Sequence, residues 1–244
     1  MNANLIRTLL LTVLLGPGVV LASSPSPAEI DRLRMQADAG RDDRALATLS
    51  TIARTGNAEA QRALGETLLR RPDGQGAREA LEWARHAAAQ GDTRAMLLLG
   101  KAWLFGLSGL RRDPAQARAW FERADPGRNP QAAYYLGLIE KGGYDRPADQ
   151  IKAVAHFRFA AQQGIAEAMY MLGNACASGE GVDADPREAM RWYLRAAALD
   201  DPQAIQELAH AFARGDTLLP QSDLQAANMA RAVEHALRHP KAAP

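Results

Sequence analysis

The chain has 244 residues, of which 29 are basic and 28 acidic, with 6% aromatic residues and a single cysteine. This nearly neutral balance gives no electrostatic reason to expect nucleic acid or a membrane surface as a partner, and one cysteine excludes an intrachain disulfide. The residues that favour helix dominate the composition, and few windows are rich in valine, isoleucine or threonine. The sequence therefore predicts an all-α protein.

Residues 1–22 have the layout of a secretory signal peptide. The segment MNANLIR carries one cation, Arg7, and precedes the apolar run TLLLTVLLGPGVVLA, which ends in a small residue before SSPSP. The run is short and is interrupted by glycine and proline, which favours a cleaved signal over the alternative, a retained membrane anchor. We therefore predict a periplasmic protein with no stable membrane insertion after cleavage. Removing this segment would remove one cation and no acid, so the formal net charge of +1 would become zero.

Five similar segments follow one another at intervals of 35 to 37 residues. The first shared column is a small residue after a helical run, namely Gly65, Gly100, Gly137, Gly173 and Ala209. The second column is Ala80, Ala117, Ala153, Ala189 and Ala226, followed three residues later by Trp83, Trp120, His156, Trp192 and Met229. Two columns that keep one phase over five units are typical of a repeat architecture.

Each unit is predicted to form two helices. The first carries the pattern AxxxLG, whose small residues let a neighbouring helix approach, and the second carries a large ring that fills the space between pairs. Asp113, Asp149 and Asp185 are expected to cap the second helices, and Glu188 stands three residues after Asp185 as in a capping box. The units close at Gly56, Gly91, Gly127, Gly164 and Asp200, where a left-handed residue would end the helix.

The pattern predicts a right-handed αα superhelical solenoid, in which each unit buries its apolar face by stacking on the next. Residues 23–56 are expected to form a linker and a degenerate helical hairpin that caps the N-terminal end. The predicted repeats and tail follow at 57–92, 93–129, 130–165, 166–201, 202–239 and 240–244.

The fourth repeat resembles the Sel1-like repeat, a relative of the tetratricopeptide repeat with a slightly longer unit. Residues 166–198 read AEAMYMLGNACASGEGVDADPREAMRWYLRAAA, and the resemblance extends over about residues 45–236. It implies a non-enzymatic adaptor or scaffold, often exported in bacteria, that holds another protein along a concave groove. It also implies two sharper possibilities, an immunity protein against a phospholipase toxin delivered by type VI secretion and an assembly factor for envelope or exopolysaccharide machinery.

No pattern of catalytic or metal-binding residues emerges. The chain has no GxSxG motif, and the acids of residues 180–188 lack the ligand rhythm of a calcium loop. His235 and His239 have ligand-like spacing without a third ligand nearby, and Cys176 is expected to be a buried thiol. We therefore predict no enzymatic activity, no metal and no cofactor, with a cell-wall or β-lactam hydrolase as the alternative function.

The candidate binding surface lies on the first helices of the central repeats. At about 100° per residue, the first alanine, the leucine at +4 and the glycine at +5 share one packed arc. Positions +2, +3 and +6 fall on the opposite side. From these positions we predict a groove formed by Leu98, Lys101, Tyr134, Tyr135, Leu138, Tyr170, Met171 and Asn174.

Two interpretations of this surface remain open at the level of sequence. Leu98, Tyr135, Leu138 and Met171 would form a contiguous apolar stripe, which on a soluble protein usually marks a partner site. Alternatively, the twist between repeats would bury them, as large rings such as Tyr134 and Tyr170 favour. The sequence therefore predicts a monomer that binds a protein or peptide partner in this groove and does not bind nucleic acid.

Overall fold

The computed structural model describes residues 25–39, 42–71, 76–124, 129–214 and 228. Within these ranges it holds eleven α-helices, one short 3-10 helix and no strand, which confirms the all-α class. The predicted signal peptide, the tail at 240–244, His235, His239 and nearly all of the last predicted helix lie outside the described residues. No helix in the described ranges is long and apolar enough to cross a membrane.

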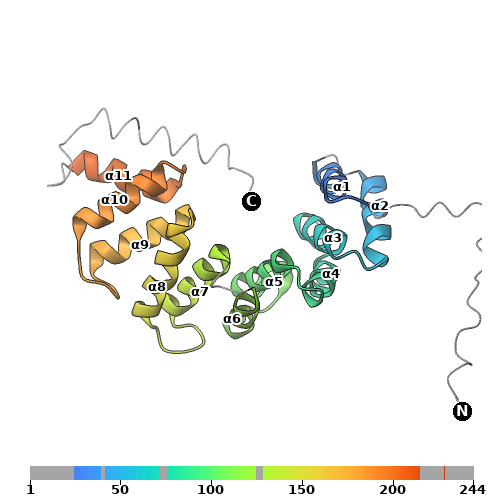
Figure 1. Ribbon diagram of the computed structural model, residues 1–244, viewed down its shortest axis with the longest axis horizontal. Helices are drawn as coiled ribbons and strands as arrows, with labels where there is room; N and C mark the ends of the chain where they lie inside the picture. Colours follow the sequence, from blue (N-terminus) through green and yellow to red (C-terminus); the bar gives the residue numbers. More distant parts are fainter. Residues whose placement is uncertain (1–24, 40–41, 72–75, 125–128, 215–227, 229–244) are drawn as a thin grey trace, which may run out of the picture.

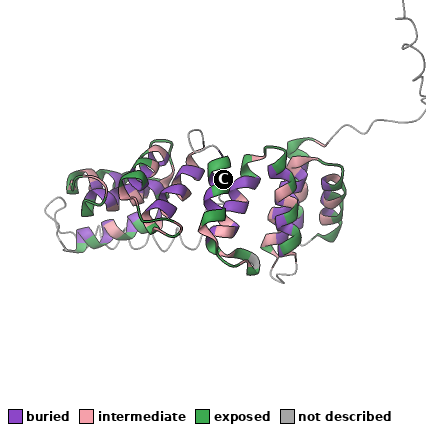
Figure 2. Cartoon of the chain, turned by 90° about the horizontal axis from the view of Figure 1, so that it is seen from below, coloured by how far each residue is buried: buried purple, intermediate pink, exposed green. Residues whose placement is uncertain are grey.

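The helices follow one another in pairs along an arc, with the first helix of each pair on its inner side (Figure 1). Each helix packs on its neighbours in the chain, both within pairs and between them, so the fold is the predicted αα solenoid. Buried residues form stripes between adjacent helices (Figure 2). The elements are α1 (Pro27–Ala39), α2 (Asp43–Arg54), α3 (Ala58–Arg70), α4 (Ala77–Ala89), α5 (Thr93–Phe105), η1 (Leu107–Gly109), α6 (Pro114–Arg123), α7 (Pro130–Gly142), α8 (Gln150–Gln162), α9 (Ala166–Ser178), α10 (Pro186–Ala197) and α11 (Pro202–Arg214).

The predicted aspartate caps of the second helices are confirmed. The carboxylates of Asp113, Asp149 and Asp185 each accept a hydrogen bond from a backbone N–H in the first turn of α6, α8 and α10. Of the predicted capping box only one half forms, in which the Asp185 carboxylate accepts from the Glu188 N–H, and the reciprocal bond to the Glu188 carboxylate was a wrong prediction. The N–H of Asp185 donates to the carbonyl of Cys176 at 2.8 Å, and the Glu188 carboxylate accepts from the Trp192 indole at 3.2 Å. The backbone of α9 therefore satisfies the group that a capping box would have served.

Four of the five predicted left-handed residues close helix pairs, and the fifth, Gly127, lies outside the described residues. Gly56, Gly91 and Gly164 have φ of +92°, and Asp200 takes the same place with φ of +61°. Because the chain turns at these points after each second helix, the next first helix returns to the inner side of the arc.

A ring seated on a glycine joins the two helices of each central pair. A Cβ atom at Gly100, Gly137 or Gly173 would lie only 2.6 Å or less from a ring carbon of Phe121, Phe157 or Tyr193. These rings come one residue after the tryptophan column, and Phe121 and Phe157 are fully buried. The tryptophan column contributes to the core as well, since Trp120 is half-buried and packs against it and Trp192 is buried in it. The ring that closes each pair, one residue later, was not predicted, because periodicity fixes the helical phase only to about a residue.

A buried ion cluster fixes the turn between α7 and α8. Arg118 of α6 is 5% exposed and donates to Glu140 at 2.5 Å and to both carboxylate oxygens of Asp145 at 2.8 and 2.9 Å. The two-pronged hydrogen bond from Arg118 holds the pKa of Asp145 below its usual range. Since all three charges are nearly removed from water, each needs the others to offset its loss of hydration.

The glycine–ring contact predicts a specific non-additivity. We expect Gly137→Ala to destabilise the fold by about 1–3 kcal/mol, because the new methyl group overlaps the Phe157 ring. Phe157→Leu should lower the free energy of unfolding on its own, yet the double variant should lose less than the sum of the two single losses. Urea denaturation of the four proteins measures this coupling. Strictly additive losses would show that the ring and the glycine are not in conflict.

The ion cluster predicts a pH-dependent contribution to stability. A carboxylate with a lowered pKa contributes fully above its unfolded pKa of about 3.9, and the contribution is lost as the pH falls through the folded pKa. We therefore expect Asp145→Asn to lower the free energy of unfolding by about 3 kcal/mol at pH 7. The difference from wild type should shrink steadily below pH 4. Asp183→Asn, which changes an exposed acid, is the matched control, and a difference independent of pH would contradict the assignment.

Candidate protein-binding groove

The eight residues predicted to form the groove lie on α5, α7 and α9, the inner helices of the three central pairs. All eight are half-buried, so neither the fully exposed stripe nor complete burial describes them. The apolar members also pack against the core behind them. They therefore present part of each side chain to the inner surface, and their role in binding stays a prediction.

Tyr135 is the centre of an aromatic cluster at the middle of the arc. Its ring stacks on Phe121 at 4.9 Å between centroids and meets the edge of Phe105 at 6.2 Å. The Lys101 ammonium lies 5.3 Å from the ring centroid of Tyr135, and Tyr134 lies against it at 5.1 Å. Burial raises the pKa of Tyr135 to about 12, so its hydroxyl stays protonated at neutral pH. This cluster is a rigid surface with one cation beside it.

Two of the predicted groove residues contact α10. The Asn174 side-chain oxygen accepts a hydrogen bond of 2.7 Å from the Tyr193 hydroxyl. Tyr170 lies 5.9 Å from the same ring, between centroids. Asn174 therefore positions the ring that occupies the Gly173 notch, a contact that only the fold reveals.

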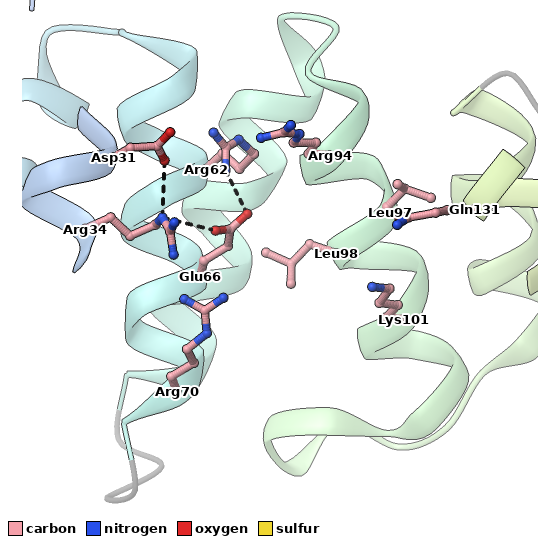
Figure 3. A pocket seen from close by; sticks show the side chains of 10 residues that line it. All are labelled: Asp31, Arg34, Arg62, Glu66, Arg70, Arg94, Leu97, Leu98, Lys101 and Gln131. Carbon is pink, nitrogen blue, oxygen red and sulfur yellow. Dashed lines mark hydrogen bonds and ion pairs between the residues drawn. The ribbon is translucent and has the colours of Figure 1, made fainter. Parts of the chain in front are cut away.

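The structure contains a cavity that no sequence pattern predicted. It has a volume of about 390 Å³ and is lined by residues from α1, α3, α5 and α7 (Figure 3). The lining residues are Asp31, Arg34, Arg62, Glu66, Arg70, Arg94, Leu97, Leu98, Lys101 and Gln131. Leu98 and Lys101 were predicted to lie in the groove, whereas the arginines were not. Arg62 and Glu66 occupy the +2 and +6 positions of the first repeat, so the same helical phase, extended to that repeat, would have found them.

The described part of the chain offers little for metal or nucleophilic chemistry. It holds no group of three histidine, cysteine or acidic side chains suited to a metal ion. Cys176 is fully buried, and burial raises the pKa of its thiol. Among the acids of residues 180–188, Glu180 pairs with Lys141 at 3.0 Å and Asp185 caps α10. These groups therefore serve helix ends and surface ion pairs.

Comparison with known proteins identifies the repeat. The Sel1 repeat profile matches residues 58–92, 93–124, 130–165 and 166–201. The crystal structure of a Sel1 repeat protein from Oxalobacter formigenes shares 27% identity with a TM-score of 0.74, over 86% of this chain and 88% of that one. These matches agree with the solenoid described above.

Two curated relatives are similar over part of their length. An uncharacterised protein of Neisseria meningitidis is 31% identical over 140 residues, or 57% of this chain and 28% of the relative. The alginate biosynthesis protein AlgK of Pseudomonas syringae pv. tomato is 31% identical over 158 residues, or 65% of this chain and 32% of the relative. The chain thus spans about a third or less of the length of these relatives.

The family matches cover the four repeats from α3 to α10. The predicted fifth repeat at 202–239 begins with α11, and only residue 228 is described beyond that helix, so the division of this end stays a prediction. Sel1 repeats form a scaffold suited to protein–protein interaction. From the repeat matches and the shared fold we conclude that the chain belongs to the Sel1 repeat family.

Proposed function

We propose that this protein is an exported, non-enzymatic adaptor that binds a segment of a partner protein along the inner face of its solenoid. The observation that carries the proposal is the row of half-buried side chains on α5, α7 and α9, backed by the aromatic cluster around Tyr135. A partner that covers them would bury apolar surface with little loss of side-chain entropy, because these side chains are already held in place by the core behind them.

For the cellular process we favour envelope polysaccharide assembly over toxin immunity. The support is the similarity to AlgK, whose name places that relative in alginate biosynthesis, together with the predicted signal peptide. The immunity role implied by the family resemblance stays a prediction. The partner recovered from the periplasm decides between them, since a secreted phospholipase would favour immunity and a component of polysaccharide machinery would favour assembly.

The hydrolase alternative has a direct test. Turnover of a chromogenic lactam or of peptidoglycan by the purified chain would contradict a role limited to binding. The buried thiol of Cys176 is not placed for such chemistry, because the thiolate is the reactive form and burial disfavours it.

The groove assignment predicts which apolar residues matter for the partner. We expect the double variant Leu98→Ser, Met171→Ser to bind the captured partner at least about tenfold more weakly, because each lost apolar contact is worth of order 1 kcal/mol. The measurement is the dissociation constant of the purified pair, with circular dichroism to confirm helicity. Tyr135 is left intact because it stacks on the buried Phe121 ring.

The matched control is Ile151→Ser, Leu194→Ser, which removes apolar side chains that are 74% and 44% exposed on the second helices α8 and α10. These substitutions carry a similar loss of helix propensity. Equal affinity of the groove variant and wild type would place the partner on another surface.

Export predicts a defined mature N-terminus. In a bacterial host, the full chain should be recovered from the periplasmic fraction with Ser23 as its first residue, because Ala22 ends the apolar run. Intact-mass spectrometry of the purified protein identifies the terminus. A protein that keeps residues 1–22 and sediments with membranes would support the retained anchor instead.

A further inference from the structure

The cavity of Figure 3 lies at the N-terminal half of the groove, and its two sides differ in electrostatic balance. On the side of α1 and α3, the arginines are paired with carboxylates. Arg62 contacts Glu66 at 2.8 Å and Asp92 at 3.3 Å, and Arg70 contacts Asp38 at 2.5 Å. Arg34 is shared among Asp31, Asp38 and Glu66. The positive charges on this side of the cavity are therefore already balanced by carboxylates of the same chain.

The side formed by α5 is different. Arg94 and Lys101 make no ion pair with any described residue, although both line the cavity. Lys101 is half-buried, and burial lowers the pKa of its ammonium group; Glu167 and Glu66 attract it only from beyond ion-pair distance. Beside the Tyr135 ring at 5.3 Å, the Lys101 ammonium has no carboxylate within ion-pair distance among the described residues, and Arg94 is exposed. A carboxylate supplied from outside would therefore offset the hydration that the half-buried Lys101 loses.

Arg94 and Lys101 are separated by two helical turns, with Leu98 between them in the cavity (Figure 3). Seven residues of α-helix span about 10 Å, which equals about three residues of an extended chain. Because alternate side chains of an extended chain share one face, an apolar residue with one acid two positions before it and another two positions after it would turn all three toward α5. The two acids would lie about 13 Å apart, within reach of the long Arg94 and Lys101 side chains, and the apolar residue would lie over Leu98.

We propose that this cavity binds an acidic segment of the partner protein, with one carboxylate at Arg94, one at Lys101 and an apolar side chain over Leu98. This deepens the proposed function and rests on it, since the segment enters the same groove. A polyuronate chain shares the carboxylate chemistry, but it carries no apolar side chain to place on Leu98. Dense phosphate is disfavoured because Asp31 and Glu66 line the same cavity.

The test is a selection from a random peptide library displayed on phage, run in parallel on three purified proteins. They are the wild-type chain, the variant Arg94→Gln, Lys101→Met, and the control Arg187→Gln, Arg191→Met. The control removes an equal number of positive charges, but from exposed positions of α10. Wild type and control should enrich peptides with two acidic residues four positions apart and an apolar residue midway between them. Synthetic peptides from that pool should bind the Arg94, Lys101 variant about tenfold more weakly, and their glutamine analogues should lose the same factor on wild type.

The other outcomes separate this proposal from the one it rests on. Apolar peptides without acids, enriched equally on wild type and variant, would overturn the carboxylate site while leaving the groove as a binding surface. Enrichment on none of the proteins would contradict peptide binding in the groove altogether. Oligouronate binding that depends on Arg94 and Lys101, without acidic peptides, would make the occupant a polysaccharide and overturn the peptide assignment.

Discussion

The close contact between a glycine of the first helix and a ring of the second sets the geometry of the molecule. At Gly100, Gly137 and Gly173 the ring of Phe121, Phe157 or Tyr193 occupies the space where a side chain would begin. At Gly65 the helices come closer still, because the carbonyl of Ala80 lies 2.8 Å from where a Cβ would be. One face of each first helix packs against the second helix in this way. Its opposite face therefore points to the inner side of the solenoid. The position of the groove is therefore a consequence of how each pair closes.

Comparison of Arg118 with Lys101 shows that burial decides whether a basic side chain needs an ion pair within the fold. Arg118 is enclosed by Glu140 and Asp145, so removing either acid would leave a buried charge without compensation, and the cluster holds the turn in place. Lys101 is only half-buried and keeps contact with solvent, so the fold tolerates it without an ion pair. Each of the three Arg118 nitrogens donates to a carboxylate of the chain, whereas the Lys101 ammonium can still form an ion pair with another molecule. Charge alone, without its burial, would not distinguish them.

Much of the fold could be predicted because its signals are local and repeated. A few neighbouring residues are enough to form the aspartate caps at 113, 149 and 185 and the left-handed residue at 200. The predicted repeats show the same pattern of residues several times, which supports the same prediction for each of them. The errors arose where a contact joins distant residues. The Asp185 N–H finds the carbonyl of Cys176 rather than the carboxylate of Glu188. Likewise, Asn174 contacts Tyr193, nineteen positions away, which no local pattern indicates.

By itself, the sequence determined the helical class, the repeat period, the helix ends and the pairing of the helices, because propensity, capping and periodicity act over one or two turns. Only the tertiary structure decided which ring enters the glycine notch, how far Tyr135 is covered, and which cations remain unpaired. These properties depend on the rotation of one helix pair against the next, and a shift of one residue in phase moves a side chain by about 100° around its helix. The cavity at Arg94 and Lys101 illustrates the difference, since its walls come from four helices that approach one another only after the pairs have stacked.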